Sequence, residues 1–443
     1  MATSSSKFRV IIVGGGPVGL YLAHALTLAN IDYVLLEQQK QVMNISGQLI
    51  FTWPQTARLL DQIGLYEAVK EAAIPLHAKS RVYGPSGHIM TTSRFWGAML
   101  DNHGYPFLPL LRSDVVRILY TSLKDKESKV RTSAEVVDIA TSPDGVRVAL
   151  KDGSVETGSV VIGADGVHSK TRSLMQALAQ KSTGQAVDVD PMLSTFHGIF
   201  ARASNDDLHV PEGVLFESRG SGAVIQCTAT RDTVHFVTLK PLPAPTTERI
   251  RFSPREMDEY ATSLGQIGVC PGVRFEDLWR SADKSSARML CQEEGFLRSW
   301  HHGRIALVGD AAHKSTSVNG LGLTCALHSA AALVNELQSV VASSTSIPPT
   351  TAAIDKAFTC YQDLRQNEVK PIWNNGHAMI REVTAISWRN WFWDNYVLPW
   401  FDIETFGRGI LVSMLVIRHG QMLKYVPFTG SHGGVAWLNR PTV

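Results

Sequence analysis

The stretch Phe8-Arg-Val-Ile-Ile-Val-Gly-Gly-Gly-Pro-Val-Gly19 is the strongest indication of the fold of this chain. The run over residues 8–13 is short and rich in β-branched side chains, which predicts a buried parallel strand. Apolar residues then recur at helical spacing from Leu20 to Ala29, and a second strand is predicted over Tyr33–Leu36. Together the three segments predict a β-α-β unit with a right-handed crossover.

The glycines of this unit predict a dinucleotide site. Gly14, Gly16 and Gly19 fit the pattern G-x-G-x-x-G, which allows a tight turn and a close approach of the backbone to a pyrophosphate. Pro17 and Val18 lie in the first helical turn, whose free N–H groups and positive dipole end favour an anion. The glycine pattern alone also occurs in structural turns. Glu37 strengthens the prediction, because a carboxylate about 20 residues further on can accept hydrogen bonds from a ribose.

Composition excludes several classes of protein. The chain has 443 residues, 44% of them hydrophobic and 19% charged, which is typical of a soluble protein of two or three domains. The net charge is +2, so we expect no nucleic-acid partner. The five cysteines include no CxxC pair, which argues against a metal site or a disulfide framework and favours a reducing compartment. Because the N-terminus lacks an apolar signal core, we expect a cytoplasmic location.

The middle of the chain has a different pattern of apolar residues. From about residue 185 to 295, short alternating runs such as Thr233–Leu239 are broken by proline and glycine, which predicts an antiparallel sheet. Gly84-Pro-Ser-Gly87 predicts a hairpin that belongs to the same sheet. The α/β pattern returns with a strand over residues 305–308 and a helix over 324–341. After a Pro-rich linker, a further amphipathic helix is predicted around residues 354–364.

Two later motifs carry a resemblance to a known family. Gly163-Ala-Asp-Gly166 resembles the "DG" motif, and Gly309-Asp310-Ala-Ala-His313 the "GD" motif, of single-component FAD-dependent monooxygenases similar to p-hydroxybenzoate hydroxylase. Arg112 lies where that family places an arginine against the flavin. The resemblance covers roughly residues 8 to 370.

The resemblance implies an α/β fold in three parts. The first is a Rossmann-like FAD-binding domain of the GR2 type, and the second is an interleaved antiparallel-sheet substrate domain. The third is a helical, aromatic-rich C-terminal appendix. The expected boundaries are 8–80, 109–184 and 296–341 for the FAD-binding domain, 81–108 and 185–295 for the substrate domain, and 351–443 for the appendix.

The resemblance also implies a set of site residues. Asp310 is expected on the ribityl chain, and Gly320 and Gly322 are expected to let the backbone approach the flavin ring. The FAD-binding residues implied in all are Gly14, Gly16, Pro17, Val18, Gly19, Glu37, Gln38, Gln48, Arg112, Asp165, Gly166, Asp310, Gly320, Gly322 and Leu323. Arg202, on a predicted sheet strand, and Phe216, where many fungal relatives carry tyrosine, are the candidate catalytic residues. A surface position is the alternative for Arg202.

Within the family, the chain looks closest to fungal epoxidases and hydroxylases of indole-diterpene and meroterpenoid pathways. The supporting stretches are Gln55–Gly64, Asp310–Lys314 and the aromatic C-terminus. The resemblance implies that FAD, NADPH and O₂ are used to epoxidise or hydroxylate a bulky apolar natural product. Leu321 and Leu323 depart from the family loop, and Phe216 replaces the tyrosine of many relatives. These three residues leave open a flavin-containing cyclase or isomerase without net redox change. A non-catalytic membrane- or partner-binding protein is the third hypothesis.

The last 71 residues hold six of the ten tryptophans. The apolar run Ile410–Ile417 has only eight residues, too few to span a membrane. The aromatic residues therefore predict either core packing over the substrate domain or a peripheral contact with a membrane surface, where tryptophan and arginine are favoured.

Overall fold

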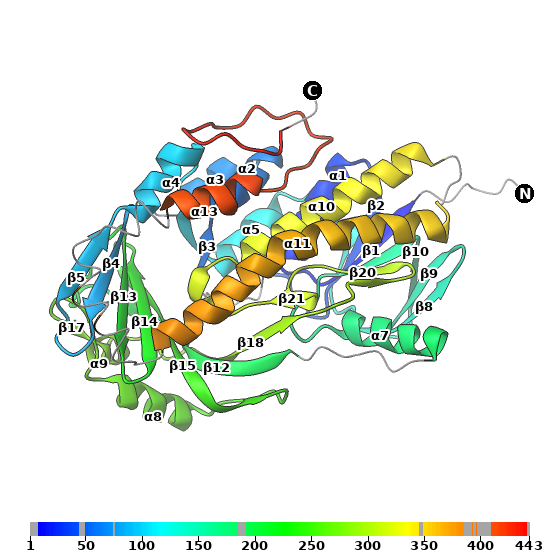
Figure 1. The fold of residues 1–443 in the computed structure, drawn as a ribbon. Coiled ribbons are helices and arrows are strands. Elements are labelled where there is room, and N and C mark those ends of the chain that lie inside the picture. Colours follow the sequence, from blue (N-terminus) through cyan, green and yellow to red (C-terminus); the bar gives the residue numbers. More distant parts are fainter. Residues whose placement is uncertain are drawn as a thin grey trace, which may run out of the picture.

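The computed structural model contains two large sheets that are linked by one long helix (Figure 1). Gln48 and four tryptophans predicted to touch a core or a membrane (388, 391, 393 and 400) lie outside the described residues. The structure describes residues 8–43, 49–73, 76–184, 192–344, 349–384, 392, 396 and 409–440.

The first sheet carries the glycine-rich turn. Its six strands run in the order β19-β20-β11-β1-β2-β7, and all neighbours are parallel except the β19–β20 pair. Val10, Ile11 and Ile12 are fully buried, as expected for a strand covered on both faces. The strands are β1 (Arg9–Val13), β2 (Asp32–Leu36), β7 (Val130–Arg131), β11 (Val160–Gly163), β19 (His301–His302) and β20 (Ile305–Leu307).

The predicted β-α-β unit is confirmed, and further helices pack beside it. The helix α1 (Pro17–Leu28) connects β1 to β2 and contacts α10 (Gly322–Ser343) and α5 (Arg112–Thr121). A small antiparallel sheet lies next to β1 and β11. Its strands are β8 (Val136–Ser142), β9 (Gly145–Leu150) and β10 (Val155–Gly158), and α7 (Lys170–Thr183) packs on β8. The short helix α6 (Lys126–Lys129) instead contacts β2 and β7 of the first sheet.

The second sheet has eight strands in the order β21-β18-β12-β15-β14-β13-β4-β5. The predicted antiparallel sheet is present, and it includes one parallel pair, β4 with β13. These two strands are far apart in the sequence, so no hairpin fixes their relative direction. The strands are β4 (Ala78–Tyr83), β5 (Ile89–Ser93), β12 (Leu193–Ser204), β13 (Val214–Gly220), β14 (Ala223–Ala229), β15 (Thr233–Thr246), β18 (Arg288–Phe296) and β21 (His313–Lys314).

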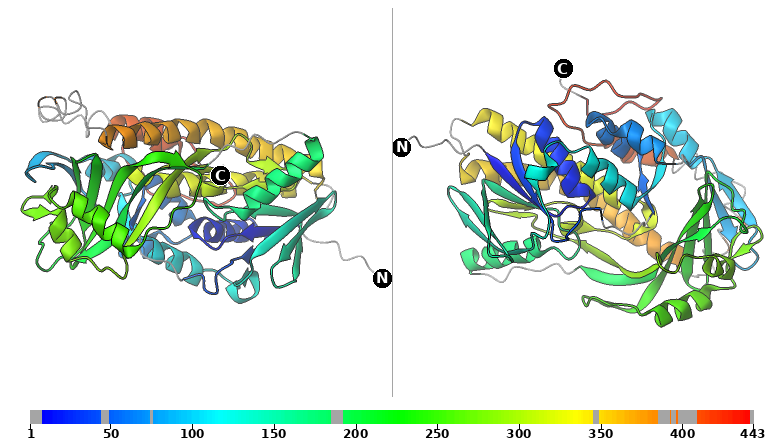
Figure 2. Two further views of the ribbon diagram at one scale, coloured as in Figure 1. Left: turned by 90° about the horizontal axis from the view of Figure 1, so that it is seen from below. Right: turned by 180° about the vertical axis from the view of Figure 1, so that it is seen from behind.

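The two faces of this sheet have different coverings. One face packs on α8 (Pro254–Leu264) and α9 (Phe275–Arg280), next to the short strands β16 (Gly268–Cys270) and β17 (Val273–Arg274). The other face meets the end of α11 (Thr351–Thr384), whose Ile380 and Val383 pack on Val224. Figure 2 shows α11 lying along both sheets. The predicted amphipathic helix is therefore confirmed as the start of a longer one.

Short elements close the region between the two sheets. The two-stranded sheet of β3 (Leu49–Thr52) and β6 (Leu108–Leu111) leads into α2 (Pro54–Gln62) and α5. The others are α3 (Tyr66–Glu71), α4 (Phe95–His103) and the 3-10 helices η1 (Gly309–Ala311), η2 (Ser317–Asn319) and η6 (Ile417–His419).

The C-terminal residues dock on the first domain. After α13 (Gly409–Leu415) and η6, residues 420–440 contain no helix. This segment is held by hydrogen bonds to side chains of α2 and α10. Leu423 exchanges two backbone hydrogen bonds of 2.8 and 3.0 Å with the Gln62 side chain. Asn335 binds Met422 and Lys424 in the same way. Within the described residues, no helix is long and apolar enough to cross a membrane.

Candidate active site

The glycine-rich turn contains glycines of two kinds. Gly14 has a φ of +109°, and a β-carbon there would lie 2.6 Å from the Ala164 carbonyl oxygen; a β-carbon at Gly19 would overlap the Gly14 carbonyl oxygen. These two positions need glycine for the fold itself. At Gly16 the space is open, and the nearest atom to such a carbon is Nη2 of Arg112, at 3.8 Å. The open space between Gly16 and a guanidinium, at the N-terminus of α1, fits an anion such as a pyrophosphate.

Glu37 lies directly beside this turn. Its carboxylate accepts hydrogen bonds from the backbone N–H of Gly15 at 2.7 Å and of Gln39 at 2.8 Å. These bonds fix the carboxylate at the end of β2, and an ionised carboxylate has lone pairs left for further donors. Gln38 follows it on the exposed surface. The predicted ribose-binding position is thus held in place by the backbone.

The DG and GD motifs are tied to each other. Asp165 accepts hydrogen bonds from the Ser169 hydroxyl (2.5 Å) and from the backbone N–H and hydroxyl of Thr171 (both 2.9 Å), which anchors the start of α7. Arg172 donates to the carbonyl of Val167 at 2.7 Å and of Ala311 at 3.1 Å, so it joins the two motif loops. Gly166 of the DG motif has a φ of +80°, in the left-handed region that favours glycine.

Asp310 lies next to these loops in η1. Its carboxylate pairs with Lys314 at 3.2 Å and is more than a third exposed. The preceding Gly309 has a φ of +66° and faces Val18 of α1, so the GD turn and the glycine-rich turn are adjacent. The structure therefore brings Gly14–Gly19, Glu37, Arg112, Asp165 and Asp310 to one edge of the first sheet.

The loop after the GD motif leads into the long helix α10. Gly320 has a φ of +63°, and its carbonyl oxygen accepts a 3.0 Å hydrogen bond from Nε1 of Trp53. Gly322 begins α10, two residues earlier than predicted, and the space beside it is open. Its first-turn N–H groups have no partners within the helix, so they favour negative charge.

A cavity of about 760 Å³ lies against this loop. Its wall is mainly apolar and aromatic, and it runs from the second sheet past α11 to α13. Trp96 and Phe107 stack with ring centroids 3.8 Å apart, and Phe51 stacks on Phe107 at 5.1 Å. The residues from the loop and the neighbouring strand are Phe51, Trp53, Val318, Asn319, Gly320 and Leu321. A volume of this size holds a ligand of several rings.

One end of the cavity meets charged side chains of the second sheet. Lys79 forms a buried ion pair with Glu217 at 3.1 Å, and Gln226 donates to the same carboxylate at 3.0 Å. Burial by itself would raise the pKa of Glu217. The charges of Lys79, Arg219 and Arg81 and the hydrogen bond from Gln226 outweigh it, so the pKa lies well below its ordinary value. Glu217 is therefore an anion that fixes Lys79 at the cavity wall.

The two candidate catalytic residues do not lie on this wall. Phe216 is buried on the opposite face of β13, in the core with α8 and α9, because alternate side chains of a strand point to opposite faces. Its neighbour Leu215 lines the cavity instead. Arg202 lies near the end of β12, half-exposed, and binds Asp283 at 2.9 and 3.2 Å. Arg202 is therefore a surface residue that pairs with Asp283, and it is not among the residues that line the cavity.

Several residues that line the cavity belong to no sequence motif, so the sequence did not predict them. Leu321 lines the cavity, whereas Leu323 is not among the lining residues and packs partly buried against the core. Gln55 lies within a stretch that supported the family resemblance, but its type and spacing indicate no role. The others, Lys79, Gln226, His328, Arg365 and Glu368, come from four elements distant in the sequence.

Comparisons with known proteins show the family of this chain. Residues 7–346 match the model of a family described as FAD binding domain. The FAD-dependent monooxygenase srdH of Neurospora crassa is 58% identical over 98% of this chain and 100% of its own length. The FAD-dependent monooxygenase ausM of Penicillium brasilianum is 32% identical over 98% of this chain and 90% of its own.

Solved structures share the fold at lower identity. HpxO of Klebsiella pneumoniae, complexed with FAD and uric acid, is similar with a TM-score of 0.75 and 20% identity, covering 92% of this chain and 97% of that one. CtdE in complex with FAD and a substrate has a TM-score of 0.71 and 16% identity, covering 92% and 99%. The chain thus belongs to the FAD-binding-domain family and, within it, to the FAD-dependent monooxygenases.

Proposed function

We propose that this FAD-dependent monooxygenase inserts one oxygen atom of O₂ into a bulky apolar natural product, by epoxidation or hydroxylation, with NADPH as the reductant. The observation that carries the proposal is the aromatic cavity of about 760 Å³, which lies against the loop of residues 318–321. That loop follows the GD motif, where the family resemblance expects the flavin ring. Relatives of this chain are named FAD-dependent monooxygenases of several fungi.

One group of residues would bind FAD, and a second group, at the cavity, would bind the substrate. Gly16, Arg112 and the start of α1 would hold the pyrophosphate, Glu37 the ribose and Asp310 the ribityl chain. Bound FAD supplies hydride acceptance from a nicotinamide cofactor and activation of O₂ for the transfer of one oxygen atom. The N-terminus of α10 favours negative charge developing next to it. The aromatic wall excludes water and holds the apolar substrate against the loop.

The alternative of a flavin-containing cyclase or isomerase rests on fewer residues than the sequence suggested. Of Leu321, Leu323 and Phe216, only Leu321 lines the cavity, and Phe216 faces the opposite core. One leucine at the wall does not by itself favour chemistry without oxygen.

The experiment is incubation of the FAD-loaded protein with NADPH, ¹⁸O₂ and a panel of polycyclic terpenoid and aromatic substrates. A product heavier than its substrate by one ¹⁸O atom supports the monooxygenase. A product of unchanged mass, formed equally well without NADPH or O₂, would instead establish the cyclase or isomerase.

A finer part of the proposal is a peripheral membrane contact near the cavity. On α13, Leu411 and Leu415 are 56% and 68% exposed, and both also line the cavity. Ile410 and Met414 add to the same exposed apolar surface. Such a surface would let a lipophilic substrate pass from a bilayer to the cavity.

Co-flotation with vesicles of phosphatidylcholine and phosphatidylserine tests this contact. We expect the wild-type protein to float and the variant Leu411→Ser/Leu415→Ser to stay at the bottom of the gradient. A wild-type protein that does not float contradicts the membrane contact and leaves the oxygenation proposal intact.

A further inference from the structure

The cavity has a polar end that the FAD-binding residues do not explain. It is formed by Gln55 at the start of α2, His328 in the second turn of α10, and Gly420 after η6, all of which line the cavity. Gln55 is 2% exposed and His328 is 3% exposed. Polar side chains buried this deeply normally have hydrogen-bond partners.

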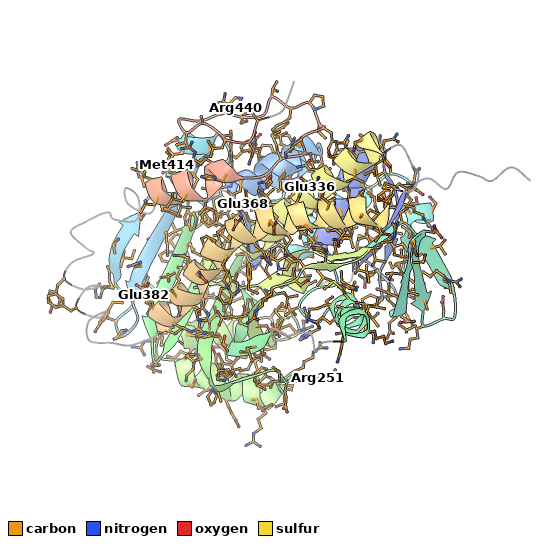
Figure 3. The ribbon with its side chains drawn as sticks, turned by 45° about the vertical axis from the view of Figure 1, so that its right-hand side comes forward. Arg251, Glu336, Glu368, Glu382, Met414 and Arg440 are labelled. Atoms are coloured by element: carbon orange, nitrogen blue, oxygen red, sulfur yellow. The ribbon has the colours of Figure 1, made fainter. Side chains whose placement is uncertain are left out.

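A chain of hydrogen bonds fixes the orientation of the His328 ring. Arg365 of α11 donates to the Cys325 carbonyl at 3.2 Å and pairs with Glu368, which Figure 3 labels near the middle of α11. Glu368 accepts a 2.6 Å hydrogen bond from the Gln421 side chain, and the backbone N–H of Gln421 donates to Nδ1 of His328 at 2.8 Å. Because Nδ1 is an acceptor, the ring proton is on Nε2.

The His328 ring is neutral. Burial, and after it the charges of Arg365 and Arg58, hold the pKa of His328 well below its ordinary value, although the Gln55 backbone acts in the opposite direction. The ring therefore presents one N–H donor, at Nε2. Within the described part of the chain, no group is in hydrogen-bonding geometry with this atom.

Gln55 leaves an acceptor unused at the same place. Its buried Oε1 has no hydrogen-bond partner among the described residues. A β-carbon built on Gly420 would lie 2.6 Å from Cβ of Gln55 and 3.1 Å from Cε1 of His328, so the two side chains flank one spot. One donor and one acceptor without hydrogen-bond partners among the described residues thus belong to side chains at the same end of the cavity.

We propose that Gln55 and His328 bind a hydroxyl group of the substrate. The hydroxyl oxygen accepts from Nε2 of His328, and the hydroxyl proton is donated to Oε1 of Gln55. A hydroxyl satisfies both groups, whereas a carbonyl or ether oxygen satisfies only the histidine. The inference rests on the proposed function, since it takes the cavity as the substrate site, and it narrows the substrate class to apolar compounds with a free hydroxyl. Both side chains are positioning residues.

The test is equilibrium dialysis of the FAD-loaded protein against 2-naphthol, 2-methoxynaphthalene and naphthalene. These planar probes match the stacked aromatic wall and differ only in the polar group. We expect the wild-type protein to bind 2-naphthol about tenfold more tightly than naphthalene, with 2-methoxynaphthalene in between. The measurement needs no turnover, so it can succeed even if no oxygen transfer is found.

Two substitutions separate the donor from the acceptor. Gln55→Met removes the acceptor at similar length, and His328→Asn removes Nε2 but keeps an oxygen close to the place of Nδ1 for the N–H of Gln421. Each substitution should reduce the preference for 2-naphthol over naphthalene at least about threefold. Only His328→Asn should also weaken the binding of 2-methoxynaphthalene. His419→Asn, at the exposed part of the cavity wall, is the matched control and should leave the preference unchanged.

Several outcomes overturn the inference. They are equal binding of 2-naphthol and naphthalene, binding of 2-methoxynaphthalene as tight as that of 2-naphthol, and a preference that persists in both variants. Absence of measurable binding by all three probes up to their solubility also counts against it. A normal thermal unfolding temperature of each variant shows that it folds.

Discussion

The two halves of the site differ in how their residues are brought together. The FAD side is built from turns between adjacent elements of one sheet, and its key positions are fixed by backbone geometry, as at Gly14 and Gly19. The cavity is built from side chains of β3, β4, α10, α11 and the C-terminal segment. A motif can specify the first, whereas the second depends on how distant segments pack.

The largest effect should come from the glycine turn. In Gly19→Ala the new methyl group overlaps the Gly14 carbonyl, so we expect FAD binding to weaken about 100-fold or more. Titration of apo-protein with FAD measures this effect. The control is Gly97→Ala, inside α4, where a β-carbon meets only the His77 carbonyl at an ordinary 3.5 Å. Equal FAD affinity in the two variants would contradict a turn fixed by its backbone.

Removing the guanidinium should have a smaller effect on the same side. Arg112→Ala deletes the cation next to Gly16, and we expect about tenfold weaker FAD binding with little change in the unfolding temperature. Arg117→Ala, further along the same helix, is the control, because its exposed side chain pairs with Asp114. If both variants bind FAD as the wild type does, Arg112 has no part in the site.

A buried histidine allows a test of the C-terminal packing. Both ring nitrogens of His103 lack partners among the described residues, and burial lowers its pKa to about 4. Between the ordinary value of 6.5 and this value, the unfolded chain binds the proton and the folded one does not, so stability falls as the pH falls. His103 therefore lowers the free energy of unfolding by at most about 1.4 kcal/mol for each pH unit in this range.

His103→Phe removes this proton and keeps a ring against Trp437, at a present centroid distance of 5.1 Å. The free energy of unfolding, measured by urea denaturation from pH 7 to pH 4.5, should therefore fall less steeply in the variant. An unchanged slope would mean that His103 is not buried in this way.

The smallest effect concerns the link between the two halves. Trp53→Phe keeps the aromatic wall but removes the hydrogen bond from Nε1 to the Gly320 carbonyl. We expect a loss of about 1 kcal/mol in the free energy of unfolding and more NADPH consumed per product formed. Trp300→Phe, which loses its bond to the Leu297 carbonyl away from the cavity, should lose similar stability without that second effect.

The same contrast explains what the sequence could predict. The β-α-β unit, the hairpin within the second sheet and the start of α11 follow from local periodicity and glycine placement, and the structure has all three. The clustering of Glu37, Arg112 and Asp310 followed from motif order. The sequence does not show which face of β13 meets the cavity, and in the structure Phe216 lies on the other face. The orientation of His328 depends on the backbone of Gln421, 93 residues further along the chain, so no local pattern indicates it.

A visible spectrum of the purified protein, recorded before and after NADPH is added under argon, tests whether the protein binds FAD and accepts a hydride. The arrangement of Gly16, Arg112, Glu37 and Asp310 predicts a two-band flavin spectrum that bleaches on reduction, with a candidate substrate present if reduction is slow. Protein that remains colourless after incubation with FAD would contradict the assignment of this edge of the first sheet as the FAD site.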